Sequence, residues 1–150
     1  MFRRTFVILL LLLSQPTFAC VFHATLSADD MYIPQGADWT ILRSLEHENN
    51  QQLTSVSKLE GQAGFQRATW WLKLLSKDLA DRGIEDTYIY LADVRMWSHY
   101  QASNPAKMSF ETEPRGDFPY LVLTQITLSN IVSGTISFDQ AMDARLMFSR

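Results

Sequence analysis

FQRATWWLKLLSKDLADR, residues 65–82, is the most regular stretch of the chain and decides its fold. Its apolar residues recur at alternating steps of three and four, at Phe65, Ala68, Leu72, Leu75 and Leu79. This spacing predicts an amphipathic helix, because it places these side chains on one stripe. Gly83 follows as a residue that can end the helix with a positive φ. Such a stripe needs a sheet or a second helix to cover it.

Beyond residue 86 the apolar period changes from helical to alternating, which is typical of strands. Residues 87–92 and 94–100 are predicted to form either two strands around Asp93 or one long bent strand. Residues 107–113 and 119–124 are predicted to be further strands, separated by turns at 104–105 and 114–117. Because the connections are short, we expect a meander of mostly antiparallel strands.

The segment before the long helix predicts a short helix with Asp38 as its N-cap. Ile41, Leu42 and Leu45 fall on one face of this helix. The helix ends in the polar run 46–52.

The last thirty residues predict two more short helices and an edge strand. Thr127 is expected to cap the first helix, and Gly134 to end it. Ser137 and Gln140 have the spacing of a capping box, which predicts a helix from Phe138 to about Asp143. Residues 145–149 close the chain as an edge or returning strand. The fold class is therefore predicted to be α+β, with helices packed on one face of a mostly antiparallel four- to five-stranded sheet.

Residues 1–19 have the three parts of a secretory signal peptide in order. Arg3 and Arg4 are basic, residues 6–13 are an unbroken apolar run, and residues 14–16 break it before Ala19. The run is too short for a transmembrane helix, which needs about 20 residues. We therefore expect cleavage after Ala19, a single α+β domain over residues 20–150, and a periplasmic or secreted protein without a transmembrane helix.

The charge of this domain excludes the simplest nucleic-acid binders. Without Arg3 and Arg4, eleven basic residues stand against sixteen acidic ones, a formal net charge of −5. No basic stripe and no run of five like charges is present, so we expect no nucleic-acid partner.

Cys20 is the one cysteine of the chain and would be the first residue after cleavage. Three interpretations stay open. Cys20 could carry a lipid anchor that ties the domain to a membrane, although residues 17–19 differ from the usual lipobox. Cys20 and His23 could bind copper or zinc, to which the new N-terminal amine could add a third ligand. The third interpretation is an ordinary thiol near the chain terminus.

The C-terminal segments TLSNIVSG (127–134) and TISFDQAM (135–142), followed by a short strand ending at Phe148, resemble the C-terminal part of sterol-carrier-protein type-two domains. The resemblance extends back to Phe65 through the order of helix and strands. It implies helices on one face of a five-stranded sheet that enclose an apolar tunnel for lipids. Ala144 departs from the family, which commonly has glycine before its last strand.

The sequence has no Gly-x-Ser-x-Gly elbow, no phosphate-binding glycine loop and no His-Glu-x-x-His pair, so we expect no enzyme and no cofactor. Two hypotheses remain. The first is an exported envelope protein with a small non-enzymatic domain that binds a hydrophobic or lipid-like ligand. Its candidate pocket walls are Trp71, Trp97, Phe110 and Tyr120, unless these four side chains only fill the core. The second is an envelope interaction or metal-handling accessory protein that uses Cys20 and His23.

Overall fold

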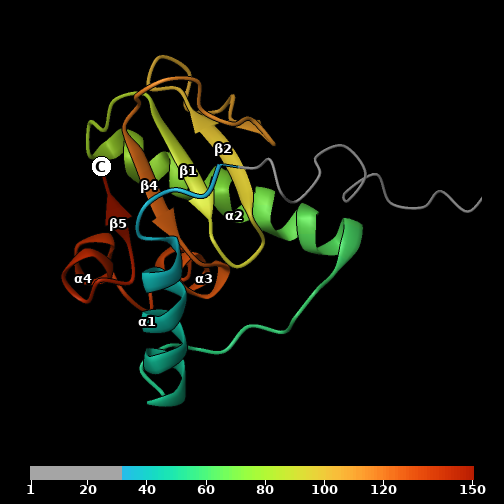
Figure 1. Ribbon diagram of the computed structural model, residues 1–150, viewed down its shortest axis with the longest axis vertical. Coiled ribbons are helices and arrows are strands. Elements are labelled where there is room, and N and C mark those ends of the chain that lie inside the picture. Colours follow the sequence, from blue (N-terminus) through green and yellow to red (C-terminus); the bar gives the residue numbers. More distant parts are fainter. Residues whose placement is uncertain (1–31) are drawn as a thin grey trace, which may run out of the picture.

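The structure is a computed structural model that describes residues 32–150 (Figure 1). The elements in chain order are α1 (Ala37–Asn49), α2 (Gly61–Asp81), β1 (Thr87–Leu91), β2 (Met96–Tyr100), β3 (Ser109–Phe110), β4 (Tyr120–Leu123), α3 (Gln125–Val132), α4 (Phe138–Asp143) and β5 (Phe148–Ser149). These elements confirm the α+β class. The predicted signal peptide, Cys20 and His23 lie outside the described residues.

The five strands form one sheet in the order β3-β2-β1-β4-β5. β1 pairs antiparallel with β2 and parallel with β4, while β3 and β5 pair antiparallel with their neighbours. The sheet is thus mostly antiparallel, as predicted, and two strands do flank Asp93. The simple meander is wrong, because β4 does not lie beside β3 but crosses to the other side of β1. All four residues of β4 are buried, which suits a strand with neighbours on both sides and both faces covered.

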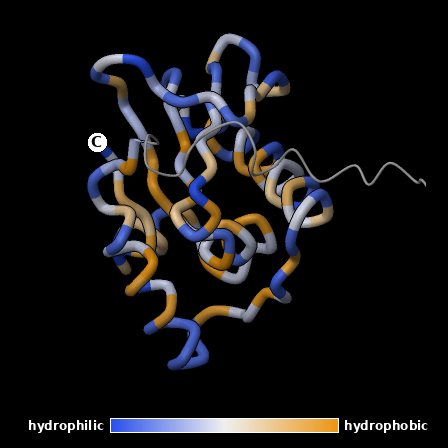
Figure 2. Tube along the Cα trace, turned by 45° about the vertical axis from the view of Figure 1, so that its right-hand side comes forward, coloured by the Kyte–Doolittle hydropathy of each residue, from blue (hydrophilic) through white to orange (hydrophobic). Residues whose placement is uncertain are grey.

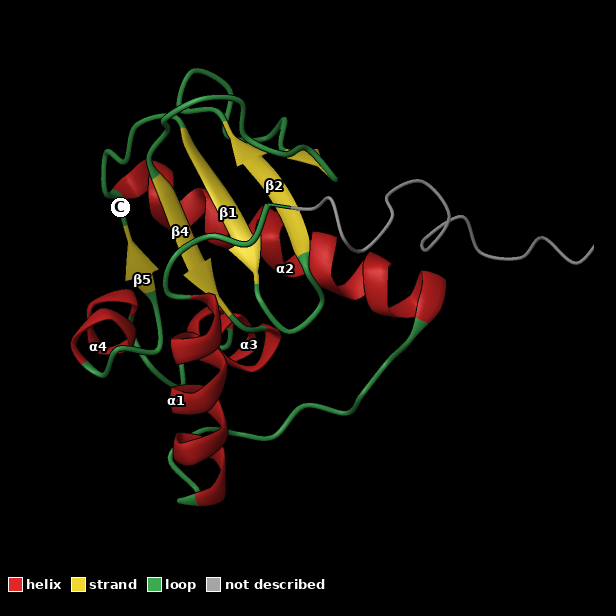
Figure 3. Cartoon of the chain, in the orientation of Figure 1, coloured by secondary structure: helices red, strands yellow, loops and turns green. Residues whose placement is uncertain are grey.

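Alternate residues of the strands contribute to two separate cores. Ile89, Leu91 and Leu123 belong to the larger core, which is shared with α2, α3 and α4. Tyr90 and Val122 point to the opposite face, where they meet the first turn of α1. Figures 1 and 3 show α2 crossing behind the sheet and α1 in front of its lower end. α1 thus contacts the face opposite to the one that α2 and α3 cover.

The long helix is confirmed and begins four residues earlier than predicted, at Gly61. Leu72, Leu75 and Leu79 of the predicted stripe are fully buried. Burying one such side chain stabilises a fold by about 1.5–3 kcal/mol, so this stripe anchors the larger core. In Figure 2 the hydrophobic segments lie mainly in the strands and helices, and the hydrophilic ones in the connecting loops.

α1 differs from its prediction at its start. It begins at Ala37, with Gly36 rather than Asp38 at the N-cap. Gly36 has φ +90°, and a Cβ there would lie 2.5 Å from the ring of Phe148, so only glycine fits. The inward face carries Thr40 and Ser44, whereas Leu42 and Leu45 are 60 % and 50 % exposed.

A hydroxyl cluster explains this orientation of α1. Ser44 Oγ lies 2.7 Å from Thr124 Oγ1 and 3.0 Å from Thr127 Oγ1, and all three residues are buried. Buried hydroxyls need hydrogen-bond partners, so the polar face of α1 turns toward α3 and the leucines turn away.

The C-terminal elements follow the prediction with one correction. Thr124, not Thr127, caps α3, because its side chain accepts a hydrogen bond from the Thr127 N–H. The capping box of Ser137 and Gln140 is confirmed at the start of α4. β5 is confirmed as an edge strand. Within residues 32–150, no helix is both long enough and apolar enough to cross a bilayer.

Candidate functional site

The structure separates the four aromatic residues that the sequence offered as the walls of one pocket. Trp71 and Phe110 belong to the core on the α2 side of the sheet. Trp97 and Tyr120 lie on the opposite side, with ring centroids 6.1 Å apart in an edge-to-face contact. The indole N–H of Trp97 donates to the carbonyl oxygen of Tyr32 at 3.0 Å. The sheet therefore stands between the two pairs, and they do not wall a common cavity.

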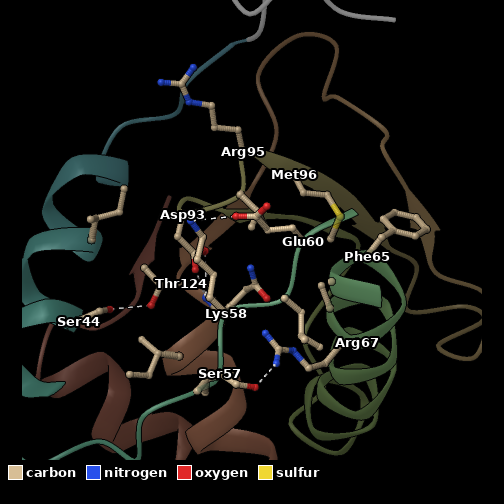
Figure 4. Close-up of a pocket in the computed structure, with 18 of the residues that line it drawn as sticks. Ser44, Ser57, Lys58, Glu60, Phe65, Arg67, Asp93, Arg95, Met96 and Thr124 are labelled. Carbon is tan, nitrogen blue, oxygen red and sulfur yellow. Dashed lines mark hydrogen bonds and ion pairs between the residues drawn. The ribbon is translucent and has the colours of Figure 1, made fainter. Parts of the chain in front are cut away.

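A different hollow lies between α1, the end of the α1–α2 loop, the first turns of α2, and the β1–β2 turn with the start of α3 (Figure 4). We call this hollow, of about 910 Å³, the groove. Ligand pockets commonly measure about 300–1,000 Å³, so the groove has room for a small molecule.

Apolar side chains from all of these elements line the groove. They include Ile41, Leu45, Val56, Leu59, Phe65, Met96 and Ile126. Leu45 and Leu59 are exposed although they are large and apolar. Exposed apolar side chains that gather around a concave surface, rather than being scattered singly, mark a binding site.

Two contacts hold the loop wall of the groove in place. Asn130 of α3 is buried and binds Thr54 twice: its Oδ1 accepts from the Thr54 N–H at 2.8 Å, and its Nδ2 donates to the Thr54 carbonyl at 2.9 Å. Farther along, the backbone of Leu59 lies so close to Gly64 of α2 that a Cβ at Gly64 would be 2.5 Å from the Leu59 carbonyl oxygen. The loop in Figure 3 is therefore fixed against α3 at one end and α2 at the other.

Arg67 of α2 is the most distinctive polar residue of the groove. Its guanidinium carbon lies 4.7 Å from the centroid of the Trp71 ring, and its Nη1 donates to Ser57 Oγ at 3.3 Å. Figure 4 shows this side chain reaching from α2 toward Ser57 on the loop. The Nε atom is buried and has no hydrogen-bond partner among residues 32–150. The stacked ring and the serine thus hold the guanidinium in place, and one of its five N–H donors has a hydrogen-bond acceptor among the described residues.

Asp93, in the turn between β1 and β2, lies beside the start of α3. Its two carboxylate oxygens lie 3.1 and 3.2 Å from the backbone N of Gln125, whose N–H they accept. Although much of the residue is exposed, desolvation of the carboxyl group raises its pKa above the ordinary value. The Gln125 N–H and the charge of Arg67 oppose this rise. The side-chain Oε1 of Gln125, another groove residue, is buried without a partner among the described residues.

The sequence held one signal for this site that the prediction did not use. Arg67 precedes Trp71 by four residues, the spacing at which a guanidinium and an indole meet on a helix surface. Asn130 and Asp93 gave no comparable signal, because their partners are Thr54 and Gln125, 76 and 32 residues away.

Within the described part of the chain, no group of three or more histidine, cysteine, aspartate or glutamate residues is placed to hold a metal ion. Comparisons of the chain with known protein families, with curated proteins and with solved structures find no match. The groove is therefore interpreted from its own geometry.

Proposed function

We propose that this chain is an exported envelope protein whose domain is a small non-catalytic binding module for a hydrophobic or lipid-like ligand, and that the ligand lies in the groove. The observation that carries the proposal is the concave apolar surface of about 910 Å³ whose walls come from four separate parts of the chain. The export part of the proposal depends on residues 1–19, and the likeness to sterol-carrier-protein type-two domains stays a prediction.

The groove has the chemistry expected of such a site. Apolar side chains form most of the wall, and the polar side chains of Arg67 and Gln125 stand among them. Few precisely placed polar groups on an apolar wall fix the orientation of a ligand.

α1 offers a matched pair of variants to test the proposal. Leu45 lines the groove, whereas Leu42, on the same helix and also exposed, does not. We expect isothermal titration calorimetry to detect binding of dodecanol, a neutral probe with an apolar chain. Leu45→Glu should weaken this binding about tenfold or more, because it replaces apolar wall by a charge. Leu42→Glu should leave it unchanged.

Failure of the wild-type protein to bind dodecanol, or an equal loss of affinity in both variants, would refute the groove as the ligand site. The export part is tested separately by N-terminal sequencing of the protein from its native host. We expect Cys20 as the first residue, and an intact Met1 would contradict export.

A further inference from the structure

Arg67 differs from the other arginines of residues 32–150 in its surroundings. Arg43 and Arg82 are similarly half-buried, and both form ion pairs, with Glu46 and with Asp78 and Asp139 respectively. The remaining described arginines are exposed, so water can hydrate them. Arg67 alone is partly buried without a carboxylate within ion-pair distance in this part of the chain.

The neighbours of Arg67 do not neutralise it. Ser57 supplies a neutral hydroxyl, and the face of Trp71 supplies only a weak attraction. Asp93 lines the same groove and attracts Arg67 through space, but its carboxylate accepts from the N–H of Gln125 and does not come within ion-pair distance of the guanidinium. A charge withdrawn from water is costly unless a counter-charge reaches it, so this position favours an anion from outside the chain.

The charge balance of the groove favours a monoanion. Three acidic residues, Glu48, Glu60 and Asp93, and three basic ones, Lys58, Arg67 and Arg95, line it. Lys58 is paired with Glu60 at 3.2 Å. Arg95 has no ion pair among the described residues, but Figure 4 shows its side chain pointing away from Arg67. A phosphate dianion would need a second cation beside Arg67, whereas the planar guanidinium matches a single carboxylate.

We propose that the ligand of the groove is a long-chain carboxylate, with its apolar chain on the groove wall and its carboxylate bound by Arg67. This inference rests on the proposed function and names the chemical class of its ligand. The Nη2 donors make no hydrogen bond among residues 32–150 and are available to the carboxylate.

The test compares three probes of equal chain length, dodecanoate, dodecanol and dodecyl phosphate, on the protein as its host processes it. Wild-type protein should bind dodecanoate about tenfold or more tightly than dodecanol, because a hydrogen bond to a charged group is stronger than one to a neutral group. Arg67→Gln should reduce the preference for dodecanoate over dodecanol to less than about twofold. Arg67→Lys should keep part of the preference, because it retains the charge but loses the planar donor set. Arg115→Gln changes the net charge equally at an exposed site outside the groove and should keep the full preference.

The outcomes separate this inference from the proposed function. If dodecanoate and dodecanol bind equally to the wild type, the inference that the ligand is a carboxylate fails, and the proposal that the groove binds a hydrophobic ligand is kept. If the preference survives Arg67→Gln, Arg67 is not the anion site. Tighter binding of dodecyl phosphate than of dodecanoate would overturn the carboxylate in favour of a phosphate. If no probe binds, the proposed function fails as well. The wild-type comparison needs no variant, so it decides the case even if Arg67→Gln does not fold.

Discussion

Replacing Asn130 by alanine tests whether the loop wall of the groove depends on one buried side chain. Asn130 is 1 % exposed, and its amide makes three hydrogen bonds: two with the backbone of Thr54 and one, at 2.8 Å, to the carbonyl oxygen of Ile126. Each such bond contributes about 1 kcal/mol net. Thr54 is exposed, so water can take over part of its lost bonds. We therefore expect Asn130→Ala to lower the free energy of unfolding by about 2–3 kcal/mol.

Urea unfolding followed by far-ultraviolet circular dichroism measures this loss. Asn104→Ala is the matched control, because Asn104 is exposed in a turn and should change stability by less than about 0.5 kcal/mol. Asn130→Ala should also weaken dodecanol binding, since the loop that carries Val56 and Leu59 loses its attachment to α3. A loss of stability as small as that of Asn104→Ala would refute the reasoning.

Three further predictions concern single positions of the fold. Gly36→Ala should lower the free energy of unfolding by at least about 1 kcal/mol more than Gly134→Ala does. Both positions have positive φ, but only a Cβ at position 36 meets Phe148. Equal losses of stability in thermal denaturation would contradict this close contact. Ser137→Ala should cost about 1 kcal/mol by removing the capping box of α4, and an unchanged melting temperature would contradict that role. The pKa of Asp93 is raised in the folded state above its ordinary value of 3.8, so the folded state binds this proton more tightly than the unfolded chain does. As the pH rises from below 3.8 to neutrality, the wild type should therefore lose stability relative to Asp93→Asn. Urea midpoints that run parallel in pH for the two proteins would contradict the raised pKa.

The elements that the sequence predicted well are those whose signals are local. The α2 stripe depends on residues three and four positions apart, and the capping box of Ser137 and Gln140 lies within one turn. The alternation around Asp93 likewise needs only the residues of one hairpin. Period and capping are properties of short windows, and a single sequence displays them.

The arrangement of these elements depends on partners that lie far apart in the chain. β4 crosses to the far side of β1, where its four buried residues are covered on both faces. No turn residue in the sequence indicates this crossing. The orientation of α1 is decided by the match of Ser44 with Thr124 and Thr127, about eighty residues later. Hydropathy grouped Ile41, Leu42 and Leu45 on one face of this helix and gave no signal for these hydroxyls.

The candidate site was missed for the same reason. Composition favours Trp71, Trp97, Phe110 and Tyr120 for a pocket. Trp71 of α2 and Phe110 of β3 lie on one side of the sheet, however, and Trp97 of β2 and Tyr120 of β4 lie on the other. The groove is instead lined by medium-sized apolar side chains and Arg67. These residue types are common on protein surfaces, so the sequence alone does not mark them as a site before the fold brings them together.

The close approach of Gly36 to Phe148 has a consequence for biosynthesis. A ribosome delivers the chain from its N-terminus, so α1 emerges early but can contact Phe148 only after β5 has been made. β1 waits in the same way for β4. Both cores of a nascent chain therefore stay incomplete until β4 and β5 have been made.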